Sequence, residues 1–298
     1  DVDDVPTHGS EKWLNNILRE ELGFRGVVES EGGGFQTLID EHIVPNQKEA
    51  GAVALKAGVD LDITYEPAYM GLMVENVEEG RVPMFLVDRA VRRVLKLKFS
   101  LGLFENPYVN ADRASRIVHS QKNQGLALRA AREGIVLLKN KNNILPLRKN
   151  LKSIAIIGPD ADNERNQLGD YIPNVIPQHV ETILDGIKSK VTSKTKVTYV
   201  RGCNVIGNEF NEVNKAKDAA KKAEIAIVVV GENERETAGE KGTDGEGKDV
   251  ASLDLTGRQE ELVEAVYKTG TPTIVVLING RPLSTRWISK NIPGIIDA

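Results

Sequence analysis

The sequence contains a single cysteine, Cys203, among 298 residues. One cysteine cannot form a disulfide within the chain, and a metal site built from cysteines alone is excluded. Long apolar runs are missing as well. The run at 225–230 (IAIVVV) is far shorter than the roughly 18 apolar residues that a membrane-spanning helix needs. We therefore expect neither a disulfide framework nor a membrane as partner.

The sequence also has no excess of positive charge. Lys and Arg number 39 against 43 Asp and Glu, which gives a formal net charge of −4. Proteins that bind nucleic acid neutralise phosphates with basic side chains, so this balance argues against nucleic acid as a partner. The 40% hydrophobic and 28% charged residues are typical of a globular protein. At roughly 150 residues per domain, the length predicts about two domains.

Sequence signals for cofactors and metals are absent too. The segment 158–162 (GPDAD) follows a predicted strand, but it lacks the glycine spacing of a phosphate-binding turn. The histidines and Cys203 do not have zinc-site spacing. No G-x-S-x-G pattern marks a nucleophilic serine. We therefore expect no cofactor and no metal ion.

Helical patterns alternate with short apolar segments along the chain. Helices are predicted at 11–22, 46–57, 67–79, 87–101, 121–133, 180–190, 210–223 and 257–269. Strands are predicted to start at Val27 and to cover 59–63, 134–138, 154–158, 196–200, 225–230, 273–278 and the end of the chain from 295. Residues 104–117 break the pattern with Pro, Asn and Asp and predict a connection between domains. The alternation predicts an α/β fold made of parallel β/α units.

Glu31 is the first candidate for chemistry. It lies in 29–34 (ESEGGG), directly after the strand that begins at Val27. A carboxylate in this position lies at the carboxyl edge of a parallel sheet, where α/β proteins bind substrates. The three glycines leave room for a ligand beside it. The alternative is a solvated loop glutamate.

The segment 232–254 is the second candidate. It holds eight acidic and three basic residues and follows the apolar strand 225–230. A glycine-rich loop of this length within a compact domain is usually functional or mobile. Its spacing does not fit an EF-hand, which argues against calcium, and an acidic surface loop is the simpler alternative. Carboxylates from two loops suit glycoside hydrolysis, in which one attacks the sugar and another protonates the leaving oxygen.

The sequence resembles glycoside hydrolase family 3, of the bacterial β-glucosidase type, over essentially its whole length. The stretches that carry the resemblance are 19–31 (REELGFRGVVESE), 49–62 (EAGAVALKAGVDLD), 88–108 (DRAVRRVLKLKFSLGLFENPY), 130–147 (AAREGIVLLKNKNNILPL), 154–162 (IAIIGPDAD), 169–171 (GDY), 252–266 (SLDLTGRQEELVEAV) and 276–283 (VLINGRPL).

The resemblance implies a TIM-like (β/α) barrel followed by an (α/β)6 sandwich with a mostly parallel sheet, and an active site between them. On this basis residues 1–104 would be the C-terminal part of the barrel. Residues 105–133 would be a linker and helix, and 134–298 a sandwich truncated at its C-terminus. In relatives, residues that grip the sugar come from earlier barrel strands. We expect these to precede Asp1, so that this chain would not hydrolyse a substrate by itself.

The resemblance also implies the two catalytic roles. The family nucleophile is an aspartate in a Ser-Asp-Trp or similar triplet, but this sequence has Glu31 and Gly32 after Ser30. We interpret Glu31 as a working variant nucleophile, and the glycines would accommodate its extra methylene. The acid/base comes from the sandwich, and the run 245–249 (GEGKD) points to Glu246, with Glu236 and Glu240 as alternatives. Crowding by acids such as Asp244 would raise the pKa of the proton donor.

The function implied is a retaining exo-β-glycosidase, most simply a β-glucosidase acting on β-linked gluco-oligosaccharides. Two alternatives stay open. One is a sugar-binding relative with impaired catalysis, suggested by Glu31 in place of aspartate. The other is a β-xylosidase or N-acetyl-β-glucosaminidase of the same family. The resemblance further implies a periplasmic or secreted bacterial protein, and a homodimer is compatible with the sequence.

Overall fold

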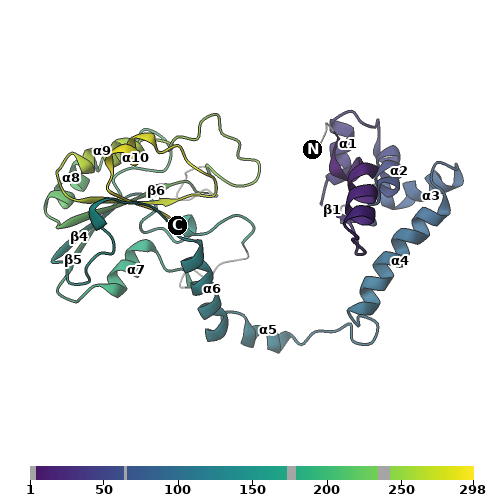
Figure 1. Ribbon diagram of the computed structural model, residues 1–298, viewed down its shortest axis with the longest axis horizontal. Helices are drawn as coiled ribbons and strands as arrows, with labels where there is room; N and C mark the ends of the chain where they lie inside the picture. Colours follow the sequence, from purple (N-terminus) through teal and green to yellow (C-terminus); the bar gives the residue numbers. More distant parts are fainter. Residues whose placement is uncertain (1–4, 64–65, 173–178, 234–241) are drawn as a thin grey trace. The chain divides into compact units, whose positions relative to one another are not determined.

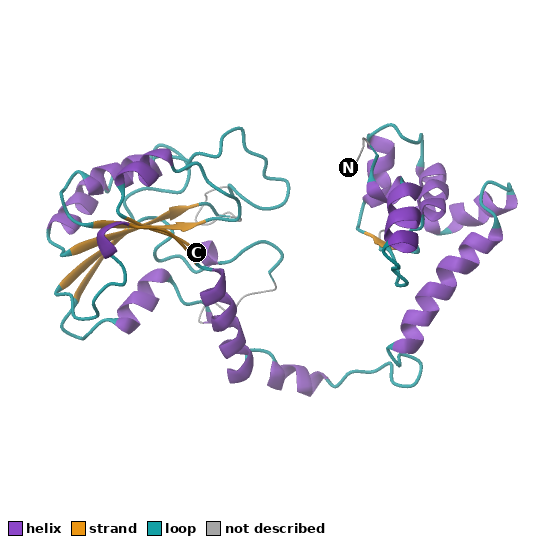
Figure 2. Ribbon diagram, in the orientation of Figure 1, coloured by secondary structure: helices purple, strands orange, loops and turns teal. Residues whose placement is uncertain are grey.

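The computed structural model describes residues 5–63, 66–172, 179–233 and 242–298. The chain divides into two compact units, Asp1–Ser115 and Arg116–Ala298. Both units combine helices and strands (Figure 2), which confirms an α/β fold. Within the described ranges, each helix is too short or too polar to cross a membrane.

Helices make up most of the first unit. They are η1 (Thr7–Gly9), η2 (Lys12–Glu21), α1 (Gly34–Asp40), α2 (Gln47–Ala57), η3 (Pro67–Tyr69), α3 (Gly71–Glu78) and α4 (Met84–Ser100), followed by α5 (Ala111–Ile117) at the boundary. Helix α2 begins where the Asn46 side chain accepts a hydrogen bond from the Glu49 N–H, and it ends at Gly58, which has a φ of 118°. Its small buried residues, including Ala50 and Ala54, let neighbouring elements pack closely against it.

Two short strands of the first unit pair in parallel. Strand β1 (Glu29–Ser30) and strand β2 (Leu61–Asp62) are in register, with Ser30 opposite Asp62. The carboxyl ends of both strands therefore lie at the same edge of this small sheet, and Glu31 is the first residue after β1. Strand β1 begins two residues later than the sequence predicts.

A six-stranded sheet is the centre of the second unit. Its strands are β3 (Val136–Asn140), β4 (Ser153–Ile157), β5 (Lys196–Val200), β6 (Ile225–Gly231), β7 (Thr273–Ile278) and β8 (Gly294–Asp297). The spatial order is β3-β8-β7-β6-β4-β5. Only the β3–β8 pair is antiparallel in this sheet, so the sheet is mixed and mostly parallel, as the sequence predicts.

Helices cover both faces of this sheet (Figure 1). The unit contains α6 (Gln121–Gly134), η4 (Lys141–Asn143), η5 (Arg165–Gln167), α7 (Ile183–Lys190), α8 (Val213–Lys221), α9 (Gln259–Tyr267) and α10 (Arg286–Asn291). Alternate residues of β6 point to opposite faces. Val228 packs in a core cluster with residues of α8, α9 and α10, whereas Ile227 packs in a second cluster with Leu184 of α7. Burial on both faces explains the continuous apolar sequence of this strand.

The chain reverses its direction across the sheet at β4. From β4 it passes to β5 on one side, and it then crosses back to β6 on the other. The connections that follow β4 and β6 therefore lead to strands on opposite sides of this pair. In doubly wound sheets, the crevice at such a switch point is the usual position of a ligand site.

Helix α1 begins at Gly34, the last glycine of the run 32–34, which we interpret from the sequence as room for a ligand. Phe35 and Leu38 of this helix are fully buried and belong to the core cluster of the first unit. Helix formation here follows from burial of these two side chains rather than from the propensity of the residues.

The predicted connection 104–117 contains a helix, α5, that the sequence pattern does not indicate. The Asn110 side chain accepts a hydrogen bond from the N–H of Arg113, and Asp112 lies in the first helical turn. Both features stabilise a helix N-terminus. The single helix predicted over 67–79 is instead divided into η3 and α3. The break is at Met70, where the ψ angle is −126°.

Candidate functional site

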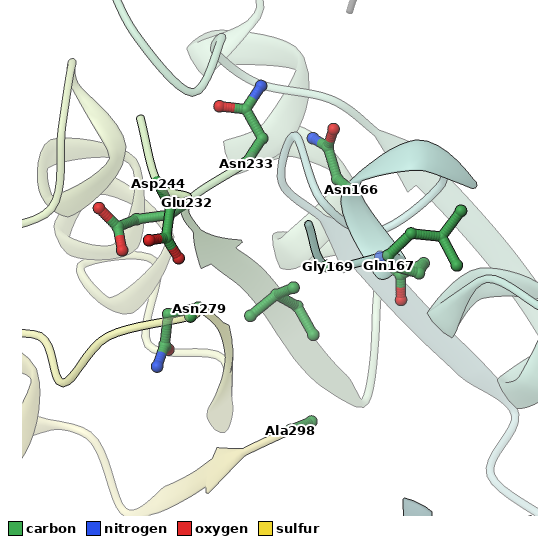
Figure 3. Close-up of a pocket in the computed structure, with 11 residues that line it drawn as sticks. Asn166, Gln167, Gly169, Glu232, Asn233, Asp244, Asn279 and Ala298 are labelled. Atoms are coloured by element: carbon green, nitrogen blue, oxygen red, sulfur yellow. The ribbon is translucent and has the colours of Figure 1, made fainter. Parts of the chain in front are cut away.

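A hollow of about 190 Å³ lies at the carboxyl edge of the second unit's sheet (Figure 3). The residues that line it lie at or beyond the ends of β4, β6, β7 and β8: Asn166, Gln167, Leu168, Gly169, Glu232, Asn233, Asp244, Ile278, Asn279, Gly280 and Ala298. The hollow therefore opens where the chain reversal at β4 places a binding crevice. Amide and carboxylate side chains give it many groups that can hydrogen-bond a polar ligand.

Glu232 directly follows β6 and is 4% exposed. Its backbone N–H donates to the carbonyl of Ile278 at 2.8 Å, which continues the pairing of β6 with β7 past the end of the strand. Burial raises the pKa of Glu232, the nearby Asp244 raises it further, and Arg281 acts in the opposite direction. Figure 3 shows the carboxyl groups of Glu232 and Asp244 close together.

Arg281, in the loop after β7, contacts both Glu232 and Asp244, which belong to the loop after β6. Its Nη2 donates to Asp244 Oδ1 at 2.9 Å, and its Nε lies 3.3 Å from Glu232 Oε2. Residue 280, next to Arg281, has no room for a side chain, because a Cβ atom on Gly280 would lie 2.1 Å from Asp244 Oδ2. Asp244, one of the acids that the sequence places near the predicted proton donor, is thus paired with Arg281.

The loop after β4 forms the opposite wall of the hollow. Asp160 is fully buried and accepts a 2.7 Å hydrogen bond from Nδ2 of Asn166. The Gln167 side chain donates to the Asp160 carbonyl at 2.8 Å. One buried aspartate thereby orders two of the polar side chains that line the site.

Glu246 lies two residues beyond Asp244 and is exposed. Its backbone N–H donates to Asp170 Oδ2 at 3.0 Å, and its carboxylate accepts a hydrogen bond from the Tyr171 hydroxyl. The loops after β4 and β6 therefore meet at this residue. The alternatives Glu236 and Glu240 lie outside the described residues, so the structure places neither of them.

Glu31, in the first unit, is exposed just beyond β1. The carbonyl of Glu31 accepts hydrogen bonds from the Gly34 N–H at 2.9 Å and from the Ser30 hydroxyl at 3.0 Å. Gly33 has a φ of 78°, and a Cβ atom on Gly34 would lie 2.3 Å from Ser30 Oγ. These glycines serve a tight turn, and the Glu31 side chain extends from that turn.

A buried aspartate supports the strand that leads to Glu31. Asp60 accepts hydrogen bonds from Arg19 at 2.6 Å, from Arg93 at 2.8 Å and from the Val28 N–H at 3.1 Å. Its side chain is fully buried. One carboxylate therefore joins η2, α4 and the residue before β1. Among the described residues, no group of three or more His, Cys, Asp or Glu side chains is arranged to hold a metal ion.

Two family models together match most of the chain. The glycosyl hydrolase family 3 N-terminal domain matches residues 1–97, and the glycosyl hydrolase family 3 C-terminal domain matches residues 135–298. The second match alone covers more than half of the sequence. The chain belongs to glycosyl hydrolase family 3. This confirms the resemblance seen in the sequence.

Curated members of family 3 are similar to the chain over nearly all of its length. A beta-xylosidase of Formosa agariphila is 38% identical over 100% of the chain and 42% of its own length. A periplasmic beta-glucosidase of Salmonella typhimurium is 32% identical over 92% of the chain and 38% of its own length. The chain thus spans about two fifths of the length of these relatives.

Solved structures agree with the family assignment. The chain is similar to the beta-glucosidase from Listeria innocua in complex with glucose, with a TM-score of 0.86 and 29% identity. This match covers 99% of the chain and 39% of that structure. A beta-glucosidase from Erythrobacter marinus matches with a TM-score of 0.84 and 30% identity, over 99% of the chain and 42% of that structure.

The sequence alone does not single out several of the residues that line the hollow or hold its loops. Glu232 is one of the eight acids of the segment 232–254, and no motif of that segment marks it. The rule that selected Glu31, a carboxylate directly after a buried strand, applies equally to Glu232. Arg281 has no such local signal, because its partners lie more than thirty residues away in the sequence.

Proposed function

We propose that the full-length protein is a retaining exo-β-glycosidase. The observation that carries this proposal is the match to both family 3 domain models. Each matched segment contains one of the two predicted catalytic carboxylates. Glu31 directly follows strand β1, and Glu246 lies in the loop after β6. We propose further that residues 1–104 belong to a TIM-like barrel, that 105–133 form a linker and helix, and that 134–298 belong to an α/β sandwich.

In this proposal Glu31 attacks the anomeric carbon and forms a covalent glycosyl-enzyme. Glu246 protonates the leaving oxygen in the first step and removes a proton from water in the second. The environment of Glu246 supports this role, because Tyr171 donates to its carboxylate and Asp170 holds its backbone. A carboxylate held by neighbours from another loop keeps a defined direction, which proton transfer requires.

β-Glucosides are the substrates that we propose first, because a beta-glucosidase is among both the curated relatives and the solved structures. β-Xylosides are a second candidate. They are favoured by the Formosa agariphila beta-xylosidase, which is 38% identical to the chain. Comparing kcat/KM of the full-length protein for aryl β-glucosides and aryl β-xylosides decides between the two.

A mechanism-based label tests the nucleophile. Incubation of the full-length protein with a 2-deoxy-2-fluoro-glycoside should attach the sugar to peptide 27–34 (VVESEGGG), with loss of activity. Label on another peptide would refute the role of Glu31. Binding of glucose without label and without turnover of an aryl β-glucoside would favour the sugar-binding alternative.

Azide tests the acid/base. In the full-length Glu246→Ala variant, azide should replace water at the glycosyl-enzyme without base assistance and accelerate turnover of an activated glycoside. The same measurement on Glu236→Ala and Glu240→Ala provides the comparison. Acceleration in one of those variants, and not in Glu246→Ala, would move the role to that residue.

We also propose a location in the periplasm or outside the cell. The similarity to a periplasmic relative supports it. Fractionation of cells that produce the full-length protein tests this location. Light scattering of the purified protein tests whether it forms a homodimer.

A further inference from the structure

One guanidinium group contacts the segment 243–248 at both of its ends. Nη2 of Arg281 donates to the Thr243 carbonyl at 3.1 Å and to the Lys248 carbonyl at 2.8 Å. Asp244 Oδ1 lies 2.9 Å from the same nitrogen, whose two hydrogens are shared among the three oxygens. Glu246 lies between these contacts. Its backbone is therefore held by the loop after β7 from one side and by Asp170 from the other.

Charge alone does not account for this arrangement. Arg281 lies next to two buried carboxylates, since the side chain of Glu232 is 3% exposed and that of Asp244 is 9% exposed. A lysine could balance the charge of one of them. It could not occupy both positions at once, because Arg281 places Nε 3.3 Å from Glu232 Oε2 while Nη2 donates to the loop, and a lysine has a single nitrogen on a flexible stem.

We propose that Arg281 is a positioning residue that holds the Glu246 loop in the geometry needed for proton donation. The inference rests on the proposed function. Arg281 acts through Asp244 and the backbone of the loop, and it touches neither the reacting carbon nor the leaving oxygen.

The proposal predicts which reactions suffer when Arg281 changes. A poor leaving group needs a proton as its bond breaks, whereas a dinitrophenolate leaves without one. A misplaced proton donor therefore slows the first kind of substrate and spares the second. A general loss of folding or of sugar binding would slow both kinds equally.

Two variants perturb the loop by independent routes. Arg281→Lys keeps the positive charge and removes the fork. Gly280→Ala keeps Arg281 and forces Asp244 to move, because the added Cβ would lie 2.1 Å from Asp244 Oδ2. The matched control is Arg258→Ala, which removes an arginine that pairs with Glu261 on the surface of the same unit.

The experiment measures kcat/KM of the full-length protein and its variants on methoxyphenyl and dinitrophenyl glycosides of the sugar that the wild type prefers. In Arg281→Lys and Gly280→Ala we expect about a 30- to 100-fold loss on the methoxyphenyl glycoside and less than about a 3-fold loss on the dinitrophenyl glycoside. Arg258→Ala should match the wild type on both. Glu246→Gln provides the reference pattern for a lost proton donor.

Each outcome has a defined meaning. Equal losses on both glycosides, or no loss in either variant, overturn the role of Arg281. If Glu246→Gln shows the selective loss and the two variants do not, the proposed function stands and this inference fails. If the wild type neither hydrolyses an aryl glycoside nor reacts with the fluoro-sugar, the proposed function fails, and this inference fails with it.

Discussion

At the scale of single residues, the position of Glu31 depends on its backbone. The Gly34 N–H and the Ser30 hydroxyl both bind the Glu31 carbonyl, so the turn is fixed while the side chain is exposed. The turn has little freedom to compensate for a change in side-chain length. The reach of residue 31 is therefore set by the number of its methylene groups.

Shortening Glu31 should reduce catalysis. Glu31→Asp withdraws the carboxylate by one methylene, and a displacement of about 1 Å can cost about 10²-fold in rate, so we expect kcat/KM on an aryl β-glucoside to fall by about that factor. Glu29→Asp is the matched control, because it makes the same change on an exposed side chain two residues earlier. An increase of activity in Glu31→Asp would mean that the site is built for aspartate.

Glu232 should make the stability of the protein depend on pH. Its pKa is raised above the ordinary value of 4.5, so the folded state binds its proton more tightly than the unfolded chain does. Its contribution to stability is full below pH 4.5 and is lost as the pH rises through the folded-state pKa. Glu232→Gln should therefore gain stability relative to the wild type as the pH rises from 4.5 through the folded-state pKa of Glu232.

Urea unfolding at several pH values measures this difference. Glu133→Gln is the control, because the Glu133 side chain is 76% exposed, and its difference from the wild type should stay nearly constant. A Glu232→Gln variant that loses stability relative to the wild type with rising pH would show that the Arg281 pairing outweighs the cost of burying the charge.

At the scale of elements, Asp60 joins parts of the first unit that are distant in sequence. Arg19 comes from η2, Arg93 comes from α4, and the Val28 N–H precedes β1. Arg19 is buried as well, with its side chain 5% exposed. Removing the aspartate therefore leaves a buried cation without its counter-charge, which is more costly than losing a surface ion pair.

Asp60→Ala should destabilise the region around β1. We expect the free energy of local opening to fall by about 3–5 kcal/mol, the typical cost of breaking a buried ion pair. Hydrogen exchange of peptides that contain residues 27–30 measures this opening. Glu75→Ala, which breaks a partly exposed pair with Lys48, should change the same quantity by less than about 1 kcal/mol. Equal effects of the two variants would contradict the role assigned to Asp60.

The sequence predicts the elements of the second unit better than those of the first. Strands such as β6 and β7 are buried on both faces, so their apolar runs identify them without further information. Strands β1 and β2 have two residues each, too few for a period to be visible. Helix α1 depends on the burial of Phe35, which becomes apparent only from tertiary packing.

Some residues of the candidate site can be predicted from the sequence, and others cannot. Glu246 and Glu31 come from motifs that are local in the sequence, and the structure describes the immediate surroundings of both. The contacts of Arg281 with Asp244, and of Asp160 with Asn166, depend on how loops fold on one another. No local pattern contains that information, so these positions could not be predicted before the fold was known.

At the scale of the whole molecule, the chain consists of two units with separate cores. Each unit matches its own family 3 domain model. The proposed chemistry uses one carboxylate from each domain and proceeds in two displacements at the same carbon. Two inversions restore the original configuration.

The full-length enzyme should therefore release the β-anomer first. Proton NMR of an aryl β-glycoside reaction should show the β-anomeric signal of the free sugar early, and the α-signal should grow later by mutarotation. Early appearance of the α-anomer would indicate a single displacement and would rule out a glycosyl-enzyme on Glu31.

The reversal of the chain at β4 also affects how this protein can change in evolution. The connections that follow β4 and β6 lead to strands on opposite sides of the sheet's middle. Loops tolerate insertions and deletions better than the strands that they connect. We therefore expect the position of an acid along the 232–254 segment to vary between homologues while the sheet stays constant. Counting residues from the end of β6 is consequently a poor guide to equivalent proton donors, and spatial superposition is a better one.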